Sequence, residues 1–426
     1  MPLLKDHPLR IEMANEMHAR PFPSLNAPSS VAFLALMHPT EAATRDRALD
    51  RAQLIKLLDR FGAPHPHPNA THYSETLGRY NLKWEQHTEF VTYTLFHDGL
   101  SERAFDPAEF SGFPEEWVST LQDVCVTSIN LRVEQRPDDA TIQKCLKNWF
   151  VQESVAVSSV LDGAAVVAGD FRLDASGHQR FAVFISKGTG SRRIGRIVQR
   201  ICEIETYKAM SMLGFSAAQN MNNEMAQINT KLSALMSDMT HRESSAEVTL
   251  KALLNVSAEL EHISAQSAFR FGATGAYEAI VNQRIAVLRE ERFQGRQTFR
   301  EFMLRRYDPA MRTVASCQKR LVTMANRAMR SGDLLWTRVD VERSAQNQEL
   351  LKSMDRRADL QLRLQKTVEG LSVVAISYYA VSLTGYLTYP LAAHLGVSKG
   401  TLTAALTLPV VALVWWAMRR IRNQMT

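Results

Sequence analysis

The sequence predicts an α+β N-terminal cytoplasmic domain, a long helical or coiled-coil stalk, and a C-terminal two-helix transmembrane hairpin. Strand and helix periodicities are mixed before about residue 187, and helix periodicity continues with few breaks to about residue 366. Two long uncharged stretches follow. We therefore divide the chain into a mixed α/β domain at 1–187, a long-helix bundle or stalk at 188–366, and a hairpin with a basic tail at 367–426.

Length and composition set the limits of this division. A chain of 426 residues has room for two or three domains and a large core. Its net charge of +6 is spread along the chain rather than clustered, which argues against a nucleic-acid partner. The four cysteines form no CxxC pair, and the first residues have no apolar segment typical of a secretory signal. We expect most of the chain to lie in the cytoplasm.

Apolar runs predict the strands of the N-terminal domain. These runs are 31–37, 89–96, 124–133, 164–173 and 181–186, and Asp174-Ala-Ser-Gly177 predicts a hairpin turn between the last two. Helical periodicity covers 42–61 and 138–150. A mixed sheet with helices packed against it follows from this pattern.

The region from about Gly190 to Lys366 has the periodicity of long helices. One apolar stripe recurs at three- and four-residue spacing and consists of Ile194, Ile197, Val198, Ile201 and Ile204. A capping-box pattern at Ser244-Ser-Ala-Glu247 predicts that one helix ends near Met239 and another begins. Asp308-Pro309 predicts a further start. We expect breaks at Gly272 and Gly275 and at Ser331-Gly332-Asp333.

Past Asp333 no proline or glycine occurs before Gly370, so we expect one helix to enter the membrane directly. The residues on its contact face include Arg and Gln, as in a helix shared between subunits, and they form no strict heptad. We therefore expect a homo-oligomer.

Two uncharged segments predict the membrane spans, at about 370–390 and 400–418. Trp415 and Trp416 close the second, where an interfacial aromatic belt belongs. Basic residues flank both outer ends, namely Arg356, Arg357, Arg363, Lys366, Arg419, Arg420 and Arg422. The positive-inside rule then places both termini in the cytoplasm, with a multi-pass anchor in the membrane and the lipid bilayer as a partner. A buried helical hairpin of a soluble protein is the alternative.

Four segments carry a family resemblance across the chain. They are HPLRIEMANEMHARPFP at 7–23, KWEQHTEFVTYT at 83–94, VAGDFRLD at 167–174 and QLRLQKTVEGLSVVAISYY at 361–379. In these the chain resembles the bacterial domain-of-unknown-function 3422 family of predicted membrane-anchored proteins. The resemblance implies a membrane anchor and no particular activity.

The predicted architecture is also similar to that of CorA-type magnesium channels, which join a cytoplasmic α/β domain to stalk helices and a two-span hairpin. The Gly-Met-Asn filter of those channels is missing, since Gly385-Tyr386-Leu387 stands there. Hydrated Mg²⁺ needs oxygen ligands at a pore mouth, so conduction by that mechanism is not expected.

Two groups of residues are candidate sites. The loop Lys187-Gly-Thr-Gly-Ser-Arg-Arg193 opens a predicted helix, where backbone N–H groups can hold an anion. The anion-binding candidates are Gly188, Gly190, Ser191, Arg192 and Arg193. The sequence fits neither GxGxxG nor a Walker A loop, and a flexible turn capped by Ser191 is the alternative interpretation.

The second group is polar and lies in the signature segments. It consists of Glu16, His18, Arg20, His87 and Glu89, which would form an acid/base or ligand site if the fold brought them together. The alternative is that their charges pair to fix the N-terminal segment onto the domain. No pattern identifies a catalytic residue, a metal ligand or a cofactor.

Three functions stay open at this stage. The first is a non-enzymatic, oligomeric scaffold or interaction protein at the inner membrane. The second is a CorA-like ion channel or transporter without the Gly-Met-Asn filter. The third is a membrane-tethered ligand sensor or enzyme that uses the polar group.

Overall fold

The computed structural model describes residues 5–16, 22–38, 46–241, 244–394 and 398–425, and it divides into two compact units. The first unit spans 1–241 and 251–331, and the second spans 242–250 and 332–426. The first contains a sheet and the helices on it, and the second contains most of the last two helices.

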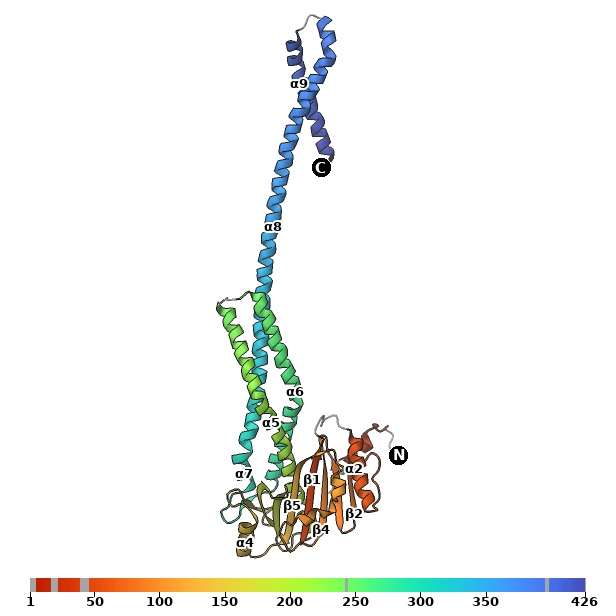
Figure 1. Ribbon diagram of the computed structural model, residues 1–426, viewed down its shortest axis with the longest axis vertical. Helices are drawn as coiled ribbons and strands as arrows, with labels where there is room; N and C mark the ends of the chain where they lie inside the picture. Colours follow the sequence, from red (N-terminus) through yellow and green to blue (C-terminus); the bar gives the residue numbers. More distant parts are fainter. Residues whose placement is uncertain (1–4, 17–21, 39–45, 242–243, 395–397, 426) are drawn as a thin grey trace. The chain divides into compact units, whose positions relative to one another are not determined.

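A nine-stranded sheet forms the centre of the first unit (Figure 1), with strand order β2-β3-β4-β1-β5-β8-β7-β6-β9. The strands are β1 (Ser29–Met37), β2 (His72–Leu77), β3 (Tyr80–Gln86), β4 (Phe90–Asp98), β5 (Val124–Gln135), β6 (Ala156–Val160), β7 (Ala165–Leu173), β8 (Gln179–Ile185) and β9 (Glu291–Arg292). Neighbouring strands are antiparallel except β5 and β8, which are parallel.

The two halves of the sheet repeat one order of elements, a strand, a helix and three antiparallel strands. In the first half α2 (Arg47–Arg60) follows β1, and in the second α4 (Asp139–Trp149) follows β5. The helices α2 and α4 lie on the same face of the sheet, and each covers its own half. In the first half, η1 (Pro107–Gly112) and α3 (Glu115–Val118) complete this cover. Strand alternation sends Leu82 and Trp84 of β3 into the core under α2.

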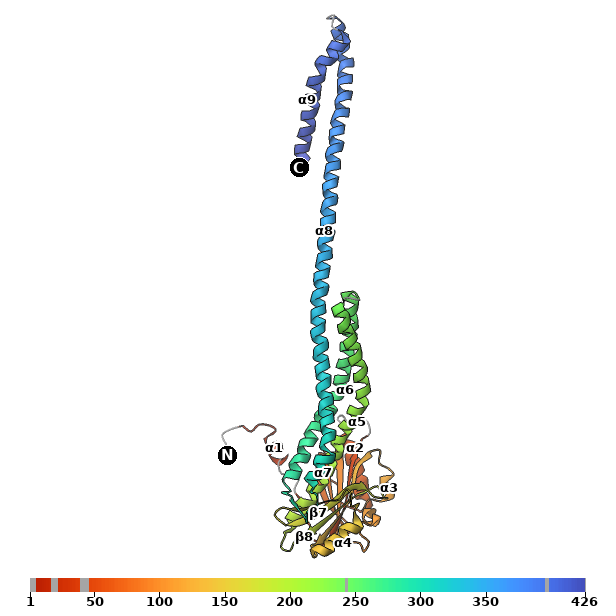
Figure 2. The ribbon, with the colours of Figure 1, turned by 90° about the vertical axis from the view of Figure 1, so that its left-hand side faces the viewer.

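The opposite face of the sheet is covered by α5 (Ser191–His241), which begins directly on it. All five residues of the predicted stripe, from Ile194 to Ile204, are buried. This helix, α6 (Ala246–Ala286) and the start of α8 (Asp308–His394) lie side by side in both views (Figures 1 and 2). The short α7 (Phe299–Arg306) carries a complete capping box from Thr298 and Glu301, and α1 (Arg10–Glu16) lies near the N-terminus.

Contacts between side chains hold these helices together within the first unit. The Ser211 hydroxyl on α5 lies 2.8 Å from the hydroxyl of Tyr307, and Lys231 pairs with Glu259 of α6 at 2.9 Å. The thiol of Cys317 on α8 packs against Met225 of α5. The bundle is thus continuous with the helical cover of the sheet.

The second unit contains the rest of α8 and α9 (Lys399–Met425), which folds back along the end of α8 in both views. Both helices contain a stretch that is long and apolar enough to span a membrane, and only 6% of each apolar window is buried. Pro390 and Pro409 lie inside these helices without ending them.

Two expected helix breaks are wrong. The helix α6 continues through Gly272 and Gly275, and α8 continues through Gly332. A glycine inside a helix costs only about 1 kcal/mol relative to alanine, which packing of neighbouring side chains readily offsets. Buried Phe271 and Ser331, each next to one of these glycines, supply such packing.

Candidate functional site

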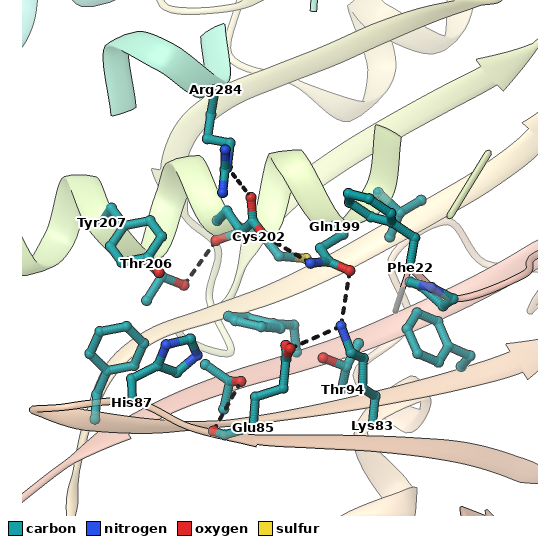
Figure 3. A pocket seen from close by; sticks show the side chains of 17 residues that line it. Phe22, Lys83, Glu85, His87, Thr94, Gln199, Cys202, Thr206, Tyr207 and Arg284 are labelled. Carbon is teal, nitrogen blue, oxygen red and sulfur yellow. Dashed lines mark hydrogen bonds and ion pairs between the residues drawn. The ribbon is translucent and has the colours of Figure 1, made fainter. Parts of the chain in front are cut away.

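A cavity lies between the sheet and α5 in the first unit (Figure 3). Its volume is about 220 Å³, and its floor is formed by β3, β4 and β1. The roof is one face of α5, and Phe22 and Arg284 lie at its margins. Because every lining residue belongs to the first unit, the cavity is a property of that unit alone.

Strand register sets the floor. Lys83 lies opposite Thr94 on β4, which lies opposite Phe33 on β1, so these three side chains form one row across the sheet. Glu85 and Thr92 form the next row on the same face. Neighbouring positions on β3 point to the other face, into the core under α2. Alternation therefore places a polar row above an apolar core.

The roof follows from helix spacing. Gln199, Glu203 and Tyr207 recur at four-residue intervals and face the cavity beside Cys202 and Thr206. The neighbouring face of α5 carries the buried apolar stripe from Ile194 to Ile204, which packs on the sheet. The same helix thus supplies both the apolar contact and the polar roof.

A chain of polar contacts crosses the cavity. The Lys83 ammonium lies 3.1 Å from Glu85 Oε1 and donates to Gln199 Oε1 at 2.9 Å. The Gln199 amide donates to Glu203 Oε1 at 2.8 Å, and Arg284 of α6 donates to Glu203 Oε2. Two ion pairs on opposite sides of the cavity are therefore bridged by one amide (Figure 3).

The N-terminal segment closes one side. Leu25 N–H donates to the Ser191 carbonyl at 3.2 Å, and Ser24 donates to the Ser191 hydroxyl at 2.7 Å. A Cβ at Gly195 would lie 1.7 Å from the Pro23 carbonyl oxygen, so only glycine allows this close approach. Phe22, the residue before this anchor, then reaches the cavity margin.

The chemistry of the cavity suits binding. Burial raises the pKa of the Cys202 thiol, so the thiol stays protonated and is a poor nucleophile at neutral pH. Glu85 and Glu203 each contact a cation. Within the described part of the chain, no group of three or more His, Cys, Asp or Glu side chains converges as a metal site.

The predicted polar group is only partly placed. His18 and Arg20 lie outside the described residues, as does the side chain of Glu16. The His87 ring lines the cavity and stacks on Phe90, with ring centroids 4.4 Å apart.

Glu89 serves a different contact. It is 1% exposed, lies 2.6 Å from Arg270 of α6 and accepts a hydrogen bond from the Tyr277 hydroxyl at 2.7 Å. Burial raises the pKa of Tyr277, and the bond to Glu89 raises it further. Glu89 thus attaches α6 to the sheet and does not line the cavity.

The predicted anion site lies at the start of α5. Gly188 adopts a positive φ of 83° in the turn before the helix, and Gly190 accepts a bond from Arg193 N–H at 2.8 Å. The Arg193 guanidinium donates to the Leu161 carbonyl at 3.2 Å, and Ser191 is held by the N-terminal segment. Ser191 is the first residue of α5, and its hydroxyl accepts from Ser24. Anion binding by this loop and Arg192 stays a prediction, as does its alternative, a turn capped by Ser191.

The sequence reasoning missed five charged or polar residues of the site, namely Lys83, Glu85, Gln199, Glu203 and Arg284. One signal was present, since Lys83, Glu85 and His87 alternate with apolar or uncharged residues, which is the pattern of one strand face. The partners on α5 and α6 lie more than 100 residues away and are united only by the fold.

Comparison with known proteins identifies the family. The model of a protein family of unknown function, DUF3422, matches residues 5–425. The chain belongs to this family. The match covers both the α/β domain and the C-terminal helices, so DUF3422 describes the whole architecture. No curated protein and no solved structure matches the chain.

Proposed function

We propose that this DUF3422 protein is a membrane-anchored ligand-binding protein, whose α/β domain holds a small molecule in the cavity beneath α5. The observation that carries the proposal is the polar interior of that cavity. It keeps Lys83, which is only 7% exposed, beside an open volume of about 220 Å³. Burying a charged group is costly, and a pocket with convergent polar groups and apolar walls is the usual form of a ligand site.

The anchor is the pair of apolar stretches in α8 and α9. A core helix of a soluble protein would bury most of such a stretch, whereas 6% of each window is buried here. Several threonine hydroxyls within these stretches bond their own helix, as Thr384 does to Ala380 O at 2.7 Å and Thr407 to Thr403 O at 2.7 Å. This satisfies polar groups where no water is present. Basic flanks favour an inner-membrane hairpin with both termini in the cytoplasm.

The test is a thermal-melting screen of the full chain in detergent against a mixture of small neutral, anionic and cationic metabolites. A ligand present at 100 times its Kd stabilises the folded state by about 2.7 kcal/mol, which raises the melting temperature by several degrees. Thr94→Phe fills the floor of the cavity and should remove this shift. Thr76→Phe on the exposed face of β2 is the matched control and should keep it. A shift that survives Thr94→Phe, or none with any metabolite, contradicts the proposal.

A second role, self-association of the scaffold type, is supported by the helix α8. Every residue from 340 to 368 is exposed, although a helix of this length normally buries one face. Apolar residues recur at coiled-coil spacing along one side, at Leu350, Met354, Leu364, Val368 and Leu371, and this side is named the α8 seam. We infer that a second copy of the chain covers the α8 seam, with Arg357 and Gln361 limiting its stability.

Particle mass in detergent tests the seam. Leu364→Asp places a charge on the seam and should reduce the particle to a single chain. Leu362→Asp changes an equally exposed leucine on the opposite side and should leave the mass unchanged. A wild-type particle of one chain would exclude self-association, and a ring of several chains that conducts ions would instead favour the channel interpretation.

A further inference from the structure

The charges around the cavity sum to zero. Lys83 and Arg284 supply two positive charges, and Glu85 and Glu203 supply two negative charges. A ligand with a net charge would leave an uncompensated charge in a confined site, which is unfavourable. The cavity therefore favours a ligand that is neutral overall.

The floor offers both signs of charge at one place. Lys83 Nζ and Glu85 Oε1 lie 3.1 Å apart on the same face of β3. A lysine ammonium has three donors, and Glu85 and Gln199 use two of them. Thr94 lies opposite Lys83, the residue is 6% exposed, and its hydroxyl bonds none of the described residues. The free N–H of the Lys83 ammonium, the Glu85 carboxylate and the Thr94 hydroxyl thus belong to neighbouring residues that all line the cavity.

The walls beside this polar point are aromatic. Phe33, Phe90 and Phe96 are buried on the sheet and line the cavity, and Phe22 also lines it. They leave space of about 220 Å³, which is below the usual range for drug-sized ligands. The site is suited to a compact molecule with one apolar group.

We propose that the ligand is an α-amino acid with an aromatic or branched apolar side chain. Its ammonium and carboxylate share one carbon, so the two groups are spaced like the Lys83–Glu85 pair and can each meet the opposite charge. Its side chain then lies against the phenylalanine walls, and its net charge is zero. This inference rests on the proposed ligand-binding function and names the class of ligand.

Calorimetric titration of the full chain in detergent with L-phenylalanine tests the ligand class. Phenethylamine lacks the carboxylate and 3-phenylpropionate lacks the ammonium, so each loses one charged contact and gains a net charge. We expect each to bind at least tenfold more weakly than L-phenylalanine, and D-phenylalanine to bind more weakly as well. Equal binding of all four compounds would overturn the inference, because only the apolar group would then be recognised.

Variants test the polar floor. Glu85→Gln should weaken L-phenylalanine at least tenfold. It should also weaken phenethylamine, whose ammonium loses its partner, while 3-phenylpropionate, which needs only Lys83, should not bind more weakly. Glu134→Gln removes the corresponding carboxylate of the Arg132–Glu134 pair on β5, outside the cavity, and should leave binding unchanged. Thr94→Val serves as a second, milder variant that keeps the ion pair, and it should also weaken binding. Unchanged L-phenylalanine affinity in both cavity variants would overturn the assignment.

The inference and the proposed function fail differently. If no amino acid binds but another metabolite gives a melting shift that Thr94→Phe abolishes, the ligand class is wrong and the function stands. If no metabolite gives such a shift, both are wrong.

Discussion

The buried contact between Glu89 and α6 gives the sharpest prediction for stability. Glu89 is 1% exposed, and its partner Arg270 has a side chain that is 19% exposed. Glu89→Gln removes the negative charge and leaves the guanidinium largely buried without a counter-charge. Breaking a buried pair in this way costs about 3–5 kcal/mol. We expect a value near the lower end, about 3 kcal/mol, because Arg270 keeps some contact with water.

A double-mutant cycle separates the pair from its surroundings. Arg270→Met leaves the Glu89 carboxylate buried and unpaired, so it should destabilise at least as much as Glu89→Gln. The double variant should lose less than the two single losses added together, by about 2 kcal/mol or more. Melting temperatures of the full chain in detergent, followed by circular dichroism, measure all four proteins.

The control is Glu259→Gln, whose partner Lys231 is half exposed, and its cost should stay below about 1 kcal/mol. Strict additivity in the cycle, or a Glu89→Gln protein that melts with the wild type, would refute this account. Glu89 would then have to be explained by a role other than attaching α6 to the sheet.

Three further predictions follow from single positions. Gly195→Ala forces Pro23 away from α5 and should lower the melting temperature. Gly272→Ala is the control, because its added Cβ meets no atom within 4 Å. It should raise the melting temperature, since alanine is more favourable than glycine in a helix by about 1 kcal/mol. Burial raises the pKa of Tyr307 to about 12, so with rising pH the unfolded chain loses this proton before the folded chain does. The free energy of unfolding should therefore fall between about pH 10 and 12, and it should fall less steeply in Tyr307→Phe. Reporter fusions at Met1 and Thr426 should be cytoplasmic and one at Val397 periplasmic, and an external Thr426 reporter would contradict the hairpin.

Apolar periodicity predicted much of the fold. The stripe of α5 and the strands β1, β4, β5, β7 and β8 follow from sequence patterns that burial on one or both faces imposes. The start of α8 at Asp308 and the end of α5 at His241 agree with their capping signals. Such elements are predictable because local pattern and tertiary packing favour the same structure.

The missed elements have physical reasons. Strand β3 carries Lys83 and Glu85 on a face that α5 covers in the fold. Charged residues usually indicate an exposed segment, so the sequence pattern did not predict a buried strand there. Strand β2 lies at the sheet edge and is largely polar. The glycines of α6 and α8 were taken as breaks because propensity was given more weight than packing.

The candidate site was less accessible from sequence than the fold. His87 was selected and does line the cavity, but Glu89, two residues further on, turns to α6. The cavity combines residues from β3, β4, α5 and α6, and a single sequence contains no information on which distant positions meet.

Native mass spectrometry of the full chain tests the central claim most directly. The protein, released from detergent after incubation with the metabolite mixture, should carry one small molecule per chain, and Thr76→Phe should carry the same mass. Thr94→Phe should carry none, because the new ring fills the floor of the cavity. Equal added mass on the wild type and on Thr94→Phe would place the ligand elsewhere and contradict the account.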